Sequence, residues 1–257
     1  MPLHVEQRGS GSGPPVVLLH GFTQTARLWG PFGDDLAADH TLIGIDLPGH
    51  GGSDTVRADL PTAAGLVREA VISAIGADPC DLLGYSLGAR VALHVVTATD
   101  LDVGHLMLVG GTGGIEDPVG RERRRQADEA TAAALEESGD VESFIARWVR
   151  SPMFARLAGA AQPEERLRNT AAGLASSLRL AGTGTQEPLW DRLPSLAVPL
   201  LALAGTDDNR FAAHALRLAH AVPSGVASLI PGGGHAAHLA QPSLVARTVR
   251  HWLATTR

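Results

Sequence analysis

The feature that most constrains the fold of this chain is a series of short apolar runs separated by longer stretches of helical character. Each run holds a few mainly aliphatic residues, and the runs lie at 16–19, 42–45, 81–83, 106–109 and 200–203. Such runs are typical of strands buried on both faces, and strands that alternate with helices form a parallel sheet. The pattern predicts a doubly wound α/β sheet, with an edge strand at 3–7, a last strand at 226–230 and a final helix at 242–255.

The composition argues against several classes of protein. With 257 residues, 44% of them hydrophobic, the chain is long and apolar enough for one large folded domain. A formal net charge of −6 argues against nucleic-acid and anionic-membrane partners. The single cysteine, Cys80, excludes an internal disulfide and a multi-cysteine metal site. Because no apolar run approaches the roughly 20 residues of a membrane span, we expect a cytoplasmic protein.

The sequence changes character between residues 114 and 188. Apolar strand runs give way to amphipathic stretches rich in Ala, Arg and Glu. The helices predicted there span 120–138, 141–150 and 164–181. A helical block between two sheet strands, with Gly and Pro at its flanks, is a candidate lid. We therefore expect a core formed by 1–113 and 189–257, with a helical cap, 114–188, inserted between the two parts.

Residues 84–88 read Gly-Tyr-Ser-Leu-Gly, a G-x-S-x-G motif between the 81–83 run and an Ala- and Val-rich stretch of helical character. In this context the motif is typical of a nucleophile elbow, the strained turn that exposes a serine hydroxyl in the α/β-hydrolase fold. Ser86 is therefore the candidate catalytic serine, and a tight glycine turn without a catalytic role is the alternative. Tyr85, the only tyrosine, is carried by the same turn, and we expect it to reach the cavity.

A serine hydroxyl reacts weakly at neutral pH unless a base, itself oriented by a carboxylate, accepts its proton. In this fold the acid follows a late strand and the histidine a later one. Asp207 and Asp208 both follow the 200–203 run, and the Gly-x-x-Asp pattern of the fold selects Asp208, leaving Asp207 as a turn or cap residue. His235, after three glycines, is the predicted base, and we expect His238 at the pocket rim or in solvent.

The segment after the first buried run, His20-Gly21-Phe22, lies where this fold draws one of its two oxyanion-hole amides. The N–H groups of Phe22 and Leu87 should converge on one developing negative charge. His20 is interpreted as a structural loop histidine, and Asp46 as an anchor of the loop that follows it.

Arg90 lies one turn beyond Ser86, on a helix that packs against the sheet. Burying an arginine there is costly unless it is paired or faces an anion, so it points either to the pocket or to an internal salt bridge. One face of the first cap helix carries Arg121, Arg124, Arg125 and Asp128. Spacing alone makes that face look solvated. Trp148 belongs to an apolar stripe and is either part of the lid core or a pocket wall.

In the motifs described above and in further segments, the chain resembles the 2-succinyl-6-hydroxy-2,4-cyclohexadiene-1-carboxylate synthases, menaquinone-pathway lyases of the α/β-hydrolase superfamily. The resemblance runs nearly end to end, over 20–22, 46–53, 84–90, 121–128, Trp148 with 151–154, Arg168, 182–190 and 234–238. The elbow and loop motifs are shared with many hydrolases. Arg90, the arginine-rich cap helix and the 182–190 stretch are more specific.

The resemblance implies that Arg124 and Arg168 bind substrate together with Arg90. It also implies the substrate, the small polycarboxylate 2-succinyl-5-enolpyruvyl-6-hydroxy-3-cyclohexene-1-carboxylate. Guanidinium groups suit such an anion because they bind carboxylates in a planar, bidentate manner. The implied reaction eliminates pyruvate, with Ser86 abstracting a ring proton and with no metal or organic cofactor.

Two other functions stay open from the sequence. A hydrolase of esters, lactones or C–C bonds would use the same triad with Ser86 as nucleophile. Only Arg90, Arg124 and Arg168 separate it from the lyase, since simple ester pockets are mostly apolar. The second is a non-catalytic receptor for a small ligand, against which an intact triad argues.

Overall fold

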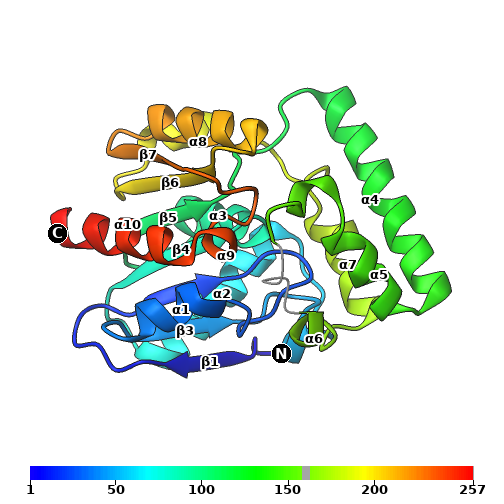
Figure 1. The fold of residues 1–257 in the computed structure, drawn as a ribbon, viewed down its shortest axis with the longest axis horizontal. Helices are drawn as coiled ribbons and strands as arrows, with labels where there is room; N and C mark the ends of the chain where they lie inside the picture. Colours follow the sequence, from blue (N-terminus) through cyan, green and yellow to red (C-terminus); the bar gives the residue numbers. More distant parts are fainter. Residues whose placement is uncertain (158–162, 257) are drawn as a thin grey trace.

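The structure, a computed structural model, describes residues 1–157 and 163–256. Seven strands of these residues form one sheet in the order β1-β3-β2-β4-β5-β6-β7 (Figure 1). Their bounds are β1 Val5–Arg8, β2 Val16–Leu19, β3 Leu42–Ile45, β4 Cys80–Tyr85, β5 Val103–Val109, β6 Leu200–Gly205 and β7 Gly225–Ile230. Only β1 runs antiparallel to its neighbour in this sheet. The predicted, mostly parallel α/β sheet is confirmed.

Helices cover both faces of the sheet, which is why strands such as β2 and β3 are apolar at every position. Val17 and Leu19 of β2 pack against one helical layer, and Val16 and Leu18 pack against the other. The first layer contains α2 (Leu60–Ile75), α3 (Leu87–Ala98) and α8 (Asn209–Ala221). The second contains α1 (Gly30–Ala37), α9 (Ala237–Ala240) and α10 (Pro242–Thr255).

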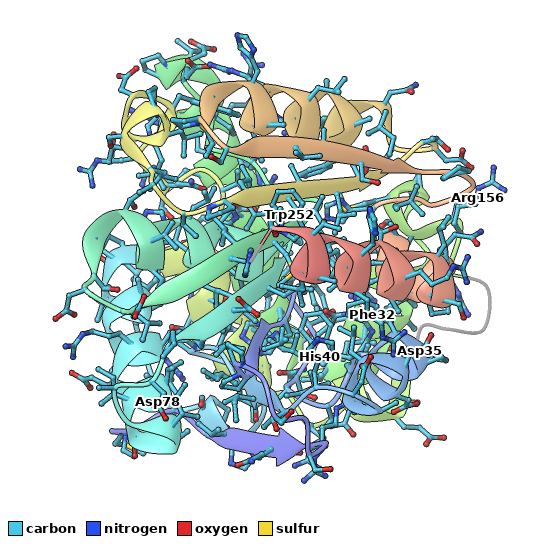
Figure 2. All side chains as sticks on the ribbon, turned by 90° about the vertical axis from the view of Figure 1, so that its left-hand side faces the viewer. Phe32, Asp35, His40, Asp78, Arg156 and Trp252 are labelled. Carbon is cyan, nitrogen blue, oxygen red and sulfur yellow. The ribbon has the colours of Figure 1, made fainter. Side chains whose placement is uncertain are left out.

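The second layer also contains Phe32 and Trp252, labelled in Figure 2, which pack between α1, α10 and the sheet. In the described part of the chain, no helix is long and apolar enough to cross a bilayer.

The strand order places a crevice between β2 and β4. After β2 the chain moves outward to β3, and it then returns to the other side of β2 as β4. The loops that leave the carboxyl ends of β2 and β4 therefore diverge to opposite faces of the sheet. In open α/β sheets such a switch point is where ligands bind. Here the two loops begin with His20 and Ser86.

Among the described residues, four further helices lie beside the sheet, on the right of Figure 1: α4 (Pro118–Ser138), α5 (Val141–Val149), α6 (Pro163–Arg166) and α7 (Ala171–Ala181). The first two follow the prediction closely. The single helix predicted at 164–181 is wrong, because two helices with a break between them occupy this stretch. At the break, the Thr170 hydroxyl caps α7 by accepting the Gly173 N–H at 3.0 Å. Asn169 bonds backbone groups of the sheet loops instead of continuing the helix.

Candidate active site

Ser86 lies in the sharp turn between β4 and α3. Its φ of 51° and ψ of −102° form a positive-φ conformation that a non-glycine residue keeps only where its surroundings hold it. The Ser86 N–H donates to Val109 O at 2.9 Å, and the Gly88 N–H donates to His20 O at 3.0 Å. These bonds hold the turn so that the serine lies at the carboxyl end of the sheet.

The two glycines of the motif let backbone segments approach each other closely. A Cβ on Gly88 would lie 1.9 Å from Leu19 O, and a Cβ on Gly84 would lie 2.4 Å from Gly88 O. Both gaps are too short for a carbon atom beside a carbonyl oxygen. The elbow can pack against β2 only with glycine at these positions.

His235 connects Ser86 to an acid. The histidine Nε2 lies 3.0 Å from the Ser86 Oγ. Its Nδ1 lies 3.2 Å from Asp208 Oδ2, an ion-pair distance, although the geometry falls short of a well-formed hydrogen bond. Burial opposes ionisation of Asp208, but contacts with His235 and the Phe211 N–H hold the pKa of its carboxyl below the usual value. The structure thus brings the three predicted triad residues together.

The two adjacent aspartates point to different partners. Asp208 faces His235 and also caps α8, accepting the Phe211 N–H at 3.1 Å. Asp207 instead forms an ion pair with the exposed Arg156. Asp208 is therefore both the carboxylate beside the base and the helix cap.

Tyr85 and His238 lie elsewhere than the sequence predicts. His238 is completely buried, with its ring among Trp29, Phe32 and Tyr85, and not at a rim or in solvent. Burial lowers the pKa of His238 to about 3, so the ring is neutral. Tyr85 is also buried, 4.5 Å from the His238 ring, and does not line the cavity in the described part of the chain. Tyr85 is the last residue of β4 and shares a sheet face with Leu83. The Tyr85 side chain therefore points into the second helical layer.

The two amides predicted for the oxyanion hole belong to residues that line the cavity. Phe22 and Leu87 both border it together with Ser86. In the residues that the structure describes, neither N–H donates to a protein acceptor. Both donors are therefore available to a ligand atom.

Buried polar contacts shape the loops around this site. His20 Nε2 accepts the Leu47 N–H at 3.0 Å, and burial lowers the His20 pKa to about 4. Asp46 accepts the N–H groups of Ala26 at 2.6 Å and Gly52 at 2.7 Å. Both residues hold loop backbone, as expected for structural roles.

A cavity that is partly open to solvent lies over the serine. Its polar lining includes Ser86, His235, Arg90, Arg124 and Arg210. Among the described residues, no group of three or more His, Cys, Asp or Glu side chains could hold a metal ion. The chemistry available in the cavity is that of a serine–histidine pair beside several guanidinium groups.

Arg90 is only 8% exposed and points to the cavity. Its Nη1 donates to Ala181 O at 2.8 Å, at the carboxyl end of α7, where the helix dipole favours a cation. Burial, assisted by the nearby Arg124, lowers the Arg90 pKa to about 10, so the side chain stays charged at neutral pH. In the described part of the chain it has no carboxylate within ion-pair distance, so the internal salt bridge is not formed.

Arg124 and Trp148 reach the same cavity from the cap helices α4 and α5. The Nε of Arg124 lies 2.8 Å from Asp128 Oδ1. Trp148 borders the cavity and also packs against Phe22, with ring centroids 5.1 Å apart. Trp148 is therefore both a pocket wall and part of the packing of the lid, the two roles that the sequence left open.

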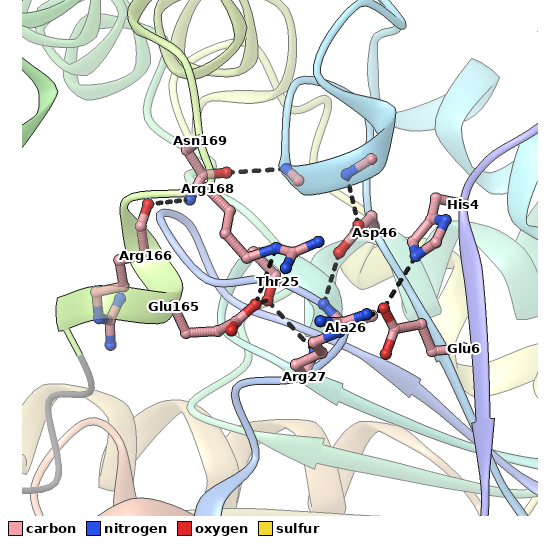
Figure 3. Close-up of polar contacts among 12 residues, drawn as sticks. His4, Glu6, Thr25, Ala26, Arg27, Asp46, Glu165, Arg166, Arg168 and Asn169 are labelled. Carbon is pink, nitrogen blue, oxygen red and sulfur yellow. Dashed lines mark hydrogen bonds and ion pairs between the residues drawn. The ribbon is translucent and has the colours of Figure 1, made fainter.

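Arg168 lies away from the cavity, in the break between α6 and α7 (Figure 3). Its Nε is 3.2 Å from Glu165 Oε1, and its side chain is 43% exposed. Glu165 in turn accepts the Thr25 hydroxyl at 3.0 Å. The structure thus ties Arg168 to a loop contact and does not bring it to Arg90 and Arg124.

The third arginine of the cavity is Arg210, which the sequence reasoning missed. It is the second residue of α8 and follows Asp208 by two positions, so its nearness to the predicted acid was a usable signal. Its neighbour Phe211 packs on the His235 ring, with centroids 4.2 Å apart. Arg210 therefore enters the site beside the triad.

Comparisons with known proteins agree with the fold. The alpha/beta hydrolase family matches residues 16–248. The 2-succinyl-6-hydroxy-2,4-cyclohexadiene-1-carboxylate synthase of Klebsiella pneumoniae is 32% identical over 94% of each chain. The structure of MenH from S. aureus superposes with a TM-score of 0.91 at 27% identity, covering 98% of each chain. A thermophilic esterase from Thermogutta terrifontis has a TM-score of 0.78 at 24% identity, covering 99% of this chain and 93% of its own, and shares the fold.

Proposed function

The chain belongs to the alpha/beta hydrolase family and, within it, to the 2-succinyl-6-hydroxy-2,4-cyclohexadiene-1-carboxylate synthases, and from this we propose how its cavity works. It is a lyase of the menaquinone pathway. The substrate is 2-succinyl-5-enolpyruvyl-6-hydroxy-3-cyclohexene-1-carboxylate, and the reaction eliminates pyruvate.

The triad supplies the base for this elimination. Asp208 holds His235, whose Nε2 accepts the proton of Ser86 across 3.0 Å. The Ser86 oxygen then removes the ring proton next to the succinyl carbonyl. The electron pair moves onto the carbonyl oxygen, where the Phe22 and Leu87 N–H groups stabilise the enolate. When the enolate collapses, a ring C2=C3 double bond forms, the C3=C4 double bond moves to C4=C5, and the C5–O bond breaks. Pyruvate leaves as its enolate, which takes up a proton.

The observation that carries the proposal is that Arg90, Arg124 and Arg210 line the same cavity as Ser86 and His235. Placing several guanidinium groups together in a partly buried cavity costs desolvation and mutual repulsion. A substrate with several carboxylates offsets both costs, whereas a neutral ester offsets neither. The cavity therefore fits a polycarboxylate better than a simple ester.

The decisive experiment combines the enolpyruvyl substrate with purified protein and follows pyruvate release by a coupled assay. Rapid-quench mass spectrometry of the same reaction should show unmodified Ser86 throughout turnover, because the serine acts as a base. Ser86→Ala is the matched control for pyruvate release.

Two results would redirect the assignment. Ester cleavage together with an adduct mass on Ser86 would favour the hydrolase. Tight binding of the substrate without turnover would favour a receptor on this scaffold.

A further inference from the structure

Asp128 is a buried carboxylate directly behind the arginines of the cavity. It lies on α4 and is 6% exposed. Its Oδ1 accepts the Arg124 Nε–H at 2.8 Å. In the described residues its Oδ2 is buried without a hydrogen-bond partner. The carboxylate thus has one donor for two shielded oxygens.

Stability does not explain this arrangement. A buried acceptor without a donor lowers stability, and the desolvation of a buried carboxylate offsets much of its attraction to an arginine. Other ion pairs of α4, such as Glu129 with Arg179, lie on the exposed side of the helix. Asp128 is the carboxylate of this helix that is placed against the cavity arginines and away from water.

The end of α7 is shaped to fit this carboxylate. A Cβ on Gly182 would lie 2.5 Å from Asp128 Oδ2, so only glycine leaves room for it. The preceding residue, Ala181, accepts the Arg90 Nη1–H at 2.8 Å. Asp128, Arg124, Arg90 and residues 181–182 therefore form one packed unit at the cavity wall, which we call the arginine cluster.

The charges within the cluster oppose and compensate each other. Arg124 lowers the pKa of Arg90, beyond the larger effect of burial, and Asp128 raises it. A carboxylate at this place therefore offsets part of the repulsion between two neighbouring cations.

We propose that Asp128 is a positioning residue for substrate binding. It holds Arg124 through Nε, which leaves the two terminal nitrogens free to bind a substrate carboxylate end-on. Its charge also offsets the repulsion between Arg124 and Arg90. This inference rests on the proposed function, since it assigns Arg124 to an anionic substrate.

Kinetics of pyruvate release provide the first test. Asp128→Ala should raise KM by roughly three- to tenfold with little change in kcat. Loss of a charged hydrogen bond to substrate would raise KM about tenfold or more, and this variant should show only part of that effect because Arg124 itself remains. Asp128→Asn keeps an acceptor for Nε and should recover most of this loss. In an Arg124→Ala background, Asp128→Ala should change KM by less than about threefold.

The control is Glu129→Gln, which removes the same charge from the exposed side of α4. It should leave KM and kcat unchanged. The melting temperature of Asp128→Ala should change little, because removal of an unpartnered buried oxygen and the restored repulsion between Arg124 and Arg90 act in opposite directions.

The second test needs no turnover. The Nε–Hε signal of Arg124, identified by its loss in Arg124→Ala, should shift clearly in Asp128→Ala and less in Asp128→Asn. An unchanged signal would overturn the inference, as would a KM effect that persists in full without Arg124. A parallel loss of kcat and melting temperature that asparagine does not recover would instead show a structural role. If the parent releases no pyruvate, the proposed function fails, and the Arg124 signal still decides whether Asp128 holds this arginine.

Discussion

Replacing Arg90 by alanine removes a cation that the fold shields almost completely from water. Arg90 is 8% exposed, borders the cavity and donates to Ala181 O. A hydrogen bond to a charged group contributes about 1.5–3 kcal/mol. At about 1.4 kcal/mol per decade, Arg90→Ala should lower kcat/KM for the enolpyruvyl substrate by roughly 10- to 150-fold. Arg90→Lys keeps the charge but loses planar two-point binding, so its loss should be intermediate.

The assay is pyruvate release at two salt concentrations, with Arg123→Ala as the control. Arg123 is exposed on α4, and its loss should change kcat/KM by less than about threefold. If Arg90→Ala behaves like Arg123→Ala, Arg90 does not bind substrate. Arg168→Ala belongs in the same series. If it lowers kcat/KM as much as Arg90→Ala does, Arg168 turns into the cavity when substrate binds.

Three further predictions concern the triad, the elbow and the buried histidines. Removing a triad side chain should lower kcat by at least about two orders of magnitude while the protein stays folded, as judged by circular dichroism. The variants are Ser86→Ala, Asp208→Asn and His235→Ala, with Asp207→Asn as the nearly silent control. Gly88→Ala forces a Cβ against Leu19 O and should destabilise the fold by more than about 3 kcal/mol, measured by urea unfolding. Stability should also fall as the pH drops below 6.5. Histidines of the unfolded chain become protonated in this range, whereas buried histidines of the folded state stay neutral; burial lowers the pKa of His20, for example, to about 4. His238→Leu should flatten this dependence in urea titrations at pH 7 and 5, and an unchanged slope would contradict it.

The sequence alone predicts those features whose causes are local. A run such as 16–19 is apolar at every position because helices cover both sides of its strand. The elbow is equally local, since strand, turn and helix follow one another within a few residues around Ser86. The order of serine, acid and histidine also follows from the sequence, because each residue follows its own predicted strand.

Features that depend on contacts between distant segments were decided only by the tertiary structure. The periodicity of α4 shows which residues share a face, but not that α7 and Arg90 lie behind that face. The break at Asn169 and Thr170 depends on sheet loops more than 100 residues away in sequence. Packing likewise turned Tyr85 and His238 into the interior and placed Arg210 in the cavity instead of Arg168. Side chains on one wall of a cavity come from separate elements, so their grouping is a property of the packed fold and not of any single stretch of sequence.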